Sequence, residues 1–292
     1  FAKDVTFGYM NANLAAWVEE KTQGRVREAD VTCITLDDLR KGGPRVVEKK
    51  ISEMKEGRVG VVDTVTYRDL EVFTTALIDA EEKGKRFLYR TSASFVRVRA
   101  GIEDKPLLKA AEILSDSANG GLTLIGSYVP RSTRQLENLL ASSHIVASEL
   151  RVENILDSQT RDKEIREIIE KANTAIEEKK DTVIYTSRNL ASSQGRAGEL
   201  AIGEKVSAAL VDCMRGIHVC PSYLIAKGGI TASDIAVKGL DVRKAVIRGQ
   251  IIPGVPVGLL GEESRFPGLS YVVFPGNVGD DFSLVNLVSD FR

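Results

Sequence analysis

Three glycine-containing segments in the second half of the chain have the composition of phosphate-binding loops. Each begins where a short β-branched strand is expected to end: Gly126-Ser127, Lys227-Gly228-Gly229-Ile230-Thr231 and Pro275-Gly276-Asn277-Val278-Gly279. Glycine lets a ligand approach the backbone closely, and free N–H groups at the start of a following helix attract anions. Because the carboxyl ends of parallel strands meet at one edge of a sheet, the three loops together predict a crevice for a phosphate or a nucleotide.

Any one of these loops, taken alone, is more readily explained as an ordinary strand-to-helix turn, since glycine is common in such turns. The presence of three such loops at one edge of the sheet favours the phosphate or nucleotide crevice. Thr231 with Asp234, and Ser132 with Gln135, have the spacing of capping boxes and predict helix starts beside two of the loops.

The standard nucleotide motifs are absent. The segment 198–206 has the glycine spacing of a Walker A loop, but Glu204 separates Gly203 from Lys205 and no Ser or Thr follows, so we expect an amphipathic helix there. No G-x-G-x-x-G follows a predicted strand, which weakens a dehydrogenase interpretation.

In the first half, Arg90, Thr91 and Ser92 directly follow the predicted strand 87–89 and place a guanidinium beside two hydroxyls. This group matches a carboxylate or a polyol. A capped helix start with Arg90 in a surface ion pair is an equally good interpretation. Asp63, just after the predicted strand 58–62, is placed like a site carboxylate, although a strand-end turn residue would look the same.

Cysteine and histidine are too sparse to support metal or nucleophilic chemistry. Cys213, His218 and Cys220 lie close together, and Cys33 is the remaining cysteine, but no C-x₂₋₄-C pair exists, so we expect no metal site. His144 is the only other histidine and there is no G-x-S-x-G, which argues against a Ser/His hydrolase.

Composition narrows the class of protein further. The 40 Lys and Arg residues balance 41 Asp and Glu, giving a net charge of -1, so neither nucleic acid nor an anionic membrane is an expected partner. The apolar runs are far shorter than the roughly 18 residues of a membrane helix. Three cysteines suit a reducing compartment, which predicts a cytoplasmic protein. The chain begins at Phe1 without a signal-peptide pattern, and we expect it to be N-terminally truncated.

Short strands alternate with segments of helical period, which predicts an α/β protein. The expected strands are 31–36, 58–62, 87–89, 122–125, 182–186, 223–226, 245–248 and 271–274. A length of 292 residues suggests two domains, and the periodicity breaks within 101–121. We therefore expect a domain over 1–115 and a domain over 116–292, each a largely parallel sheet flanked by helices, with the ligand cleft between them.

Four segments strongly resemble the four-carbon acid sugar kinase family: 89–95 (YRTSASF), 227–234 (KGGITASD), 249–256 (GQIIPGVP) and 266–280 (FPGLSYVVFPGNVGD). The resemblance spans essentially the whole chain. It implies a two-domain α/β enzyme that phosphorylates 3-oxo-tetronate, threonate or erythronate with ATP.

The resemblance also implies roles for individual residues. Residues 116–292 would form the nucleotide-binding domain, in which Ser127, the loop from Gly228 to Thr231 and Gly276 match positions that hold ATP. Residues 1–115 would form the sugar-acid domain, with Asp63, Arg90, Thr91 and Ser92 on the substrate side. The family begins with a strand, an Asp-Asp loop and a Thr-Gly-Ala segment, and this chain enters the pattern after them.

The leading hypothesis is therefore transfer of a phosphoryl group from ATP, with Mg²⁺, to a hydroxyl of a four-carbon sugar acid. Backbone groups at Gly228, Gly229 and Gly279 would hold phosphate, Arg90 would orient the carboxylate, and Asp280 is the candidate base, in competition with the missing acidic loop. The alternatives are a non-catalytic module that binds a nucleotide or a sugar acid, and a nicotinamide-dependent oxidoreductase. A homo-oligomer is compatible with the sequence.

Overall fold

The computed structural model describes residues 8–55, 57–115, 117–142, 144–188 and 196–292, without the side chains of 196–200. The chain divides into a smaller unit, Phe1–Asp104, and a larger unit, Lys105–Arg292. The division lies within the irregular stretch 101–121, but before the boundary expected at residue 115. The reason is packing: the Leu108 N–H donates to the Gln250 carbonyl at 2.8 Å, and Ile113 is buried in the core of the larger unit.

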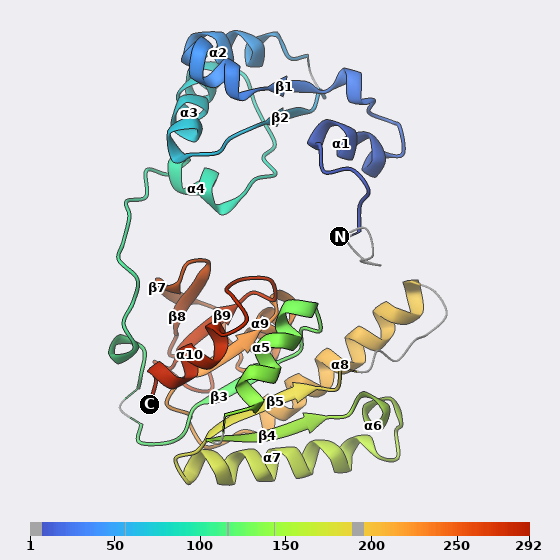
Figure 1. The fold of residues 1–292 in the computed structure, drawn as a ribbon, viewed down its shortest axis with the longest axis vertical. Coiled ribbons are helices and arrows are strands. Elements are labelled where there is room, and N and C mark those ends of the chain that lie inside the picture. Colours follow the sequence, from blue (N-terminus) through green and yellow to red (C-terminus); the bar gives the residue numbers. More distant parts are fainter. Residues whose placement is uncertain (1–7, 56, 116, 143, 189–195) are drawn as a thin grey trace. The chain divides into compact units, whose positions relative to one another are not determined.

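The larger unit is built on a seven-stranded sheet with the order β4-β5-β3-β6-β9-β8-β7 (Figure 1). The strands are β3 (Leu122–Ile125), β4 (Ile145–Leu150), β5 (Asp181–Thr186), β6 (Leu224–Lys227), β7 (Ala245–Ile252), β8 (Val255–Leu260) and β9 (Ser270–Phe274). Strands β4, β5, β3, β6 and β9 are parallel, whereas β8 and β7 form an antiparallel hairpin at one edge. The sheet is therefore mixed but mostly parallel.

Helices cover both faces of this sheet because the buried side chains of its strands alternate between two cores. Leu122 and Leu124 pack with the helices of one face, whereas Ile125 packs with those of the other. The first face carries α6 (Val152–Leu156), α7 (Arg161–Glu177), α8 (Arg196–Gly216), α9 (Gly229–Asp234) and the π-helical segment η4 (Ile235–Gly239). The second face carries α5 (Pro130–Leu140) and α10 (Ser283–Asp290).

This arrangement makes the chain diverge at the carboxyl ends of the central strands. The helix after β3 is α5, on one face, whereas the helices after its neighbours β5 and β6 are α8 and α9, on the other face. Such a reversal leaves room at the carboxyl edge of an open sheet, where ligands of α/β proteins bind. The fold thus places the three predicted loops at this edge.

Two strands of the larger unit were not expected from the sequence. Strand β8 contains Pro256, and proline is a poor residue for a strand that pairs on both sides. It is tolerated next to an irregularity, since the register with β7 shifts between Gln250 and Ile252. Strand β4 is short and lies at the opposite edge of the sheet. The segment 198–206 lies within α8, as its periodicity predicted.

The smaller unit contains a two-stranded parallel sheet of β1 (Thr32–Ile34) and β2 (Gly60–Val62). Around it lie α1 (Leu14–Thr22), α2 (Gly43–Glu53), α3 (Tyr67–Glu82) and α4 (Ala93–Arg99), with shorter turns η1 (Glu28–Asp30) and η2 (Asp38–Gly42). The apolar faces of α2 and α3 meet in one core, where Val47, Ile51 and Leu77 are buried. A short helical turn η3 (Ala110–Glu112) follows in the larger unit.

The prediction of a strand at 87–89 is wrong. Within the described part of the chain this segment pairs with no strand, and the Leu88 side chain is fully exposed. Its aromatic neighbours pack on helices instead. The rings of Tyr89 and Phe95 lie 5.5 Å apart, and the Tyr89 hydroxyl donates to Glu81. The apolar run 87–89 therefore reflects ring packing rather than a sheet ladder.

Asp69 organises the turn between β2 and α3. Its buried carboxylate accepts hydrogen bonds from the Val65 and Thr66 N–H groups at 3.0 and 2.9 Å. It also accepts two bonds from the Arg40 guanidinium, at 2.8 and 2.9 Å. The Arg40 hydrogen bond is the main reason why the pKa of Asp69 lies well below its usual range.

Replacing Asp69 with alanine is expected to lower the unfolding temperature of the chain by several degrees, because two backbone donors and a guanidinium lose their acceptor together. Thermal unfolding followed by circular dichroism measures the effect. Asp79→Ala, at an exposed position on the same helix, is the matched control. Equal unfolding temperatures for the two variants would contradict the structural role of Asp69.

Candidate functional site

The exits of β3, β6 and β9 pack against one another around Ser127. Ser132 of α5 donates from Oγ to the Gly276 carbonyl at 2.9 Å, and its Oγ lies 3.1 Å from the Ser127 Oγ. The third loop is equally close, since a Cβ placed on Gly228 would lie 3.0 Å from the Ser127 Cβ. The three loops expected to converge therefore do converge.

Glycine is required at three positions because side chains of the neighbouring loops occupy the adjacent space. A Cβ on Gly126 would lie 2.3 Å from the Thr231 Oγ1, and one on Gly276 would lie 2.6 Å from the Ser127 Oγ. Gly228 has in addition a φ of 114°, which other residues rarely adopt. Each of these glycines lets two backbone segments approach closely.

Gly229 differs from these three glycines. A Cβ placed there meets nothing within 4 Å, so the protein itself leaves open space beside it. The next residue, Ile230, is also exposed, at 68%. Gly229 is therefore an open position next to the tightly packed Gly228. Such a position allows a ligand to approach the backbone closely.

The expected capping boxes are wrong, and the residues involved have other roles. Helix α5 begins at Pro130 rather than at Ser132, and Ser132 and Gln135 use their side chains to hold the β9 exit. Helix α9 begins at Gly229, so Thr231 lies inside it with its hydroxyl beside Gly126 and Gly228. Both segments start helices because proline or glycine stands at the first turn.

Side chains of α5 hold the exit loop of β9, residues 275–281. The Arg131 guanidinium donates from Nη1 to the carbonyls of Asn277 and Gly279, at 3.0 and 2.9 Å. Gln135 donates from Nε2 to the Val278 carbonyl at 3.1 Å, and Arg134 pairs with Asp281 at 2.9 Å. The loop is therefore held by a helix in addition to its own backbone hydrogen bond from the Val278 N–H to the Pro275 carbonyl at 3.5 Å.

Asp280, the candidate base, is engaged at the start of α10. Its Oδ1 accepts hydrogen bonds from the Phe282 N–H at 3.0 Å and from the Ser283 Oγ at 2.7 Å. The bond from Ser283 is the main reason why the pKa of Asp280 is lowered. A carboxylate with a lowered pKa is a poorer proton acceptor.

Lys227 is a buried cation that the sequence analysis did not single out. It ends β6, its side chain is 0% exposed, and its Nζ donates to the Pro275 carbonyl at 3.1 Å. The ammonium lies 3.9 Å above the centre of the Phe274 ring. Burial, with the nearby charge of Arg131, lowers the pKa of Lys227 to about 7. The Lys227 Nζ thus lies between the exits of β6 and β9.

Arg188 is a second cation at this edge, half-buried and two residues after the end of β5. Its Nη1 donates to the Ser127 carbonyl at 2.6 Å, and burial lowers its pKa. Its Nε and Nη2 are buried and have no hydrogen-bond acceptor among the described residues. Among the residues that the structure describes, none of Lys227, Arg131 and Arg188 forms an ion pair. This edge of the sheet therefore carries positive charge that an anion can neutralise.

The substrate-side candidates lie in the smaller unit. Asp63 is exposed just after β2, and its N–H donates to the Ile34 carbonyl at 3.0 Å. The Arg90 guanidinium lies 5.0 Å from the centre of the Trp17 ring. Ser92 occupies the N-cap position of α4 without a side-chain capping bond, and Thr91 donates to its carbonyl at 3.1 Å. These polar groups remain exposed.

The part of the chain that the structure describes holds no cluster of three or more His, Cys, Asp or Glu residues that could bind a metal ion. Burial, helped by the nearby Asp212 charge, raises the pKa of the Cys213 thiol to about 12. This thiol is a buried apolar group. None of the described helices has the length and the apolar character that crossing a bilayer demands.

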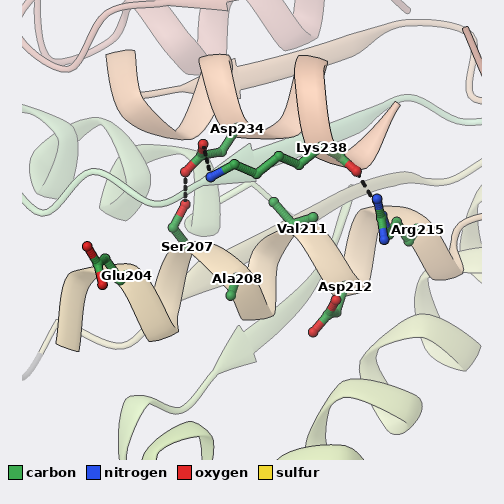
Figure 2. A pocket seen from close by; sticks show the side chains of 8 residues that line it. All are labelled: Glu204, Ser207, Ala208, Val211, Asp212, Arg215, Asp234 and Lys238. Carbon is green, nitrogen blue, oxygen red and sulfur yellow. Dashed lines mark hydrogen bonds and ion pairs between the residues drawn. The ribbon is translucent and has the colours of Figure 1, made fainter. Parts of the chain in front are cut away.

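At a hollow between α8 and the segment formed by α9 and η4, polar side chains form hydrogen bonds across the two elements (Figure 2). Asp234 accepts a hydrogen bond from Ser207 and pairs with Lys238 at 2.7 Å, while Arg215 donates to the Lys238 carbonyl at 2.7 Å. These contacts join the two helices. They fix α9, and with it Gly229, against the body of the larger unit.

Similar solved structures share this fold at low sequence identity. A Salmonella typhimurium LT2 protein, described as a candidate tRNA synthase, is 18% identical, with a TM-score of 0.61 over 89% of this chain and 60% of its own. A Haemophilus influenzae protein of the family DUF1537 is 19% identical, with a TM-score of 0.54 over 100% of this chain and 66% of its own. The chain thus spans less than two thirds of the length of either protein.

Two family models match the chain. A nucleotide-binding C-terminal domain matches residues 122–284, and a sugar-binding N-terminal domain matches residues 1–99. No curated protein matches the sequence. Because the first model covers more than half of the chain and the second covers most of the rest, the chain belongs to the four-carbon acid sugar kinase family.

Proposed function

We propose that this chain is an ATP-dependent kinase that phosphorylates a hydroxyl of a four-carbon sugar acid of the 3-oxo-tetronate, threonate or erythronate type. The observation that supports it most strongly is the carboxyl edge of the larger unit. There three loops pack around Ser127, beside the buried Lys227 and the half-buried Arg188, neither of which has an anionic partner among the described residues. A polyphosphate supplies the missing negative charge, and the family relationship makes ATP its source.

Phosphoryl transfer needs positioning and charge neutralisation more than covalent chemistry from the protein. In this proposal the backbone N–H group at Gly229 donates to a phosphate oxygen, and the Lys227 ammonium neutralises the phosphate charge. The Gly228 N–H, which was expected to do the same, is instead bound to the Phe274 carbonyl at 2.8 Å. Ser127, Thr231 and Gly276 line the nucleotide, as the resemblance implied, together with Gly279.

Mg²⁺ enters with the nucleotide in this proposal. It prefers phosphate oxygens and water to a cage made only of protein groups. That preference fits the β9 exit, where Asp281 pairs with Arg134 and Asp280 accepts hydrogen bonds from Phe282 and Ser283. When bound, the ion would neutralise charge on the phosphate oxygens.

The sugar acid is bound by the smaller unit in this proposal. Arg90 offers a planar fork that can hold a carboxylate with two hydrogen bonds, and the hydroxyls of Thr91 and Ser92 can bind those of the substrate. Asp63 is a further candidate. The group that removes the hydroxyl proton is left unassigned, because Asp280 has a lowered pKa and its carboxylate accepts hydrogen bonds from Phe282 and Ser283.

We expect Arg90→Lys to raise the KM for the acid on the order of tenfold and to leave the KM for ATP unchanged, since lysine offers only a point charge to the carboxylate. Steady-state kinetics with each substrate varied in turn measure both constants. Arg86→Lys is a matched control on an arginine outside the proposed group. Unchanged constants in the Arg90 variant would place the acid elsewhere.

The proposed function itself is tested by ATP consumption, measured with Mg²⁺ over a panel of four-carbon acids and their three- and five-carbon analogues. We expect consumption to depend on a four-carbon acid. Binding of ATP without consumption for any acid would instead favour the non-catalytic binding module, and binding of NAD(P)H would favour the oxidoreductase.

A further inference from the structure

Arg188 is half-buried at the carboxyl edge of the sheet and has two buried donor atoms without a partner in the described part of the chain. Only Nη1 of its guanidinium is used, in the bond to the Ser127 carbonyl, whereas Nε and Nη2 are buried without an acceptor among the described residues. Buried donors of a charged group are costly when they remain unpaired. An arginine in this state is explained when a ligand supplies the missing acceptors.

The position of Arg188 mirrors that of Lys227. Strands β5 and β6 are the two neighbours of β3 in the sheet, Arg188 follows β5, and Lys227 ends β6. Ser127 follows β3 and lies between them in sheet order. Since neighbouring strands lie about 4.8 Å apart, the two flanking strands are about 10 Å apart. Two cations thus bracket the Ser127 loop on opposite sides.

The fold opens on both of these sides. Helix α5, after β3, lies on one face of the sheet, whereas α8 and α9, after β5 and β6, both lie on the other. The chain therefore diverges between β3 and β6 and again between β3 and β5, and each divergence leaves space at the carboxyl edge. The Gly228 loop lies at the divergence between β3 and β6, and Arg188 lies at the divergence between β3 and β5.

We propose that Arg188 binds the terminal phosphate of the bound nucleoside triphosphate, in a subsite separate from the one that Lys227 and Gly229 form for the preceding phosphates. This inference rests on the proposed function. The terminal phosphate carries the most charge and presents several equivalent oxygens. A guanidinium keeps its charge at every pH of interest and offers two parallel N–H groups to such oxygens.

The consequence is selectivity for the triphosphate over the diphosphate. ATP contacts both subsites, whereas ADP contacts only the one beside Lys227. Arg188 therefore strengthens the binding of the substrate nucleotide and contributes nothing to that of the product, which favours product release.

Titration calorimetry with Mg²⁺ and either ATP or ADP tests this inference on the wild-type chain and three variants: Arg188→Met, Arg188→Lys and Arg166→Met. Arg166 is exposed on α7 and serves as the control. We expect Arg188→Met to weaken ATP binding at least tenfold and to change ADP binding less than twofold. Arg188→Lys keeps a charge without the fork and should lose part of the ATP affinity.

Inorganic tripolyphosphate and pyrophosphate, used as probes without the base, should show the same difference. Thermal unfolding is a second readout, because removal of the unpaired buried donors should leave the unfolding temperature of Arg188→Met unchanged or higher. If the methionine variant does not fold, Arg188→Lys alone carries the test through its ratio of ATP to ADP affinity.

Equal loss of ATP and ADP affinity would overturn the inference, since Arg188 would then act by positioning the Ser127 loop. Unchanged affinity for both nucleotides would overturn it as well. Either result leaves the proposed function standing. A wild-type chain that binds neither nucleotide would refute the proposed function itself.

Discussion

Lys227→Met is expected to weaken ATP binding on the order of a hundredfold, or about 2.8 kcal/mol. The ammonium is fully buried, and the contacts described for it are one carbonyl and one aromatic ring, so a bound phosphate would be its first anionic partner among the described residues. Methionine has a similar length without the charge, so the fold should persist. Titration calorimetry measures the loss, and Lys163→Met, at an exposed position on α7, is the control.

The same variant should abolish a pH dependence of ATP binding. The pKa of Lys227 is about 7 in the free chain, and Arg131 contributes to lowering it. A bound phosphate stabilises the ammonium and raises this pKa, so binding takes up a proton. Affinity in the wild type should therefore fall from about pH 7 to about pH 9, above the last phosphate pKa of about 6. Identical pH profiles in wild type and variant would show that Lys227 does not face the phosphates.

Gly229→Val is expected to weaken ATP binding by about tenfold or more, equivalent to about 1.4 kcal/mol. The structure leaves open space at this position, so valine fits the protein but occupies the space that a phosphate needs. Gly229→Ala should have a smaller effect, because its side chain reaches less far. Calorimetry measures the affinity for ATP and circular dichroism measures the unfolding temperature, so an effect on binding can be distinguished from an effect on folding. A folded valine variant with wild-type ATP affinity would remove this loop from the site.

The central part of the fold is predictable from local sequence. Strands β3, β6 and β9 were expected within a residue of their ends, because each is a short run of buried apolar residues followed directly by glycine or proline. Their loops could be placed together because parallel strands share an edge. The glycines at 126, 228 and 276 then follow from close packing.

The errors arise where tertiary contacts outweigh local pattern. Strand β8, which was not expected, contains Pro256, and the hairpin accommodates it beside a register shift. The segment 87–89 is a short apolar run like a strand, but its aromatic rings pack on α4 and on each other. Ser132 has the spacing of a helix cap, yet its hydroxyl binds a loop distant in the sequence. In each case a packing or hydrogen-bond contact that the local pattern does not reveal decides the outcome.

The two cations of the site, Lys227 and Arg188, could not be recognised from local sequence either. Lys227 lies in a motif that the sequence analysis quoted, and Arg188 lies just after an expected strand. Lysine and arginine are normally exposed and solvated, so their type and spacing indicate nothing unusual. Their burial, and the lack of anionic partners for them among the described residues, become visible only in three dimensions.

The most direct test of the proposed kinase activity is ³¹P NMR of the chain incubated with ATP, Mg²⁺ and one four-carbon acid at a time. The proposal predicts a new phosphomonoester signal together with an equal amount of ADP, only when a suitable acid is present. The Lys227→Met variant should form far less of both at the same ATP concentration. ADP with free inorganic phosphate in place of the ester, or no change with any acid, would contradict the assignment of this chain as a sugar-acid kinase.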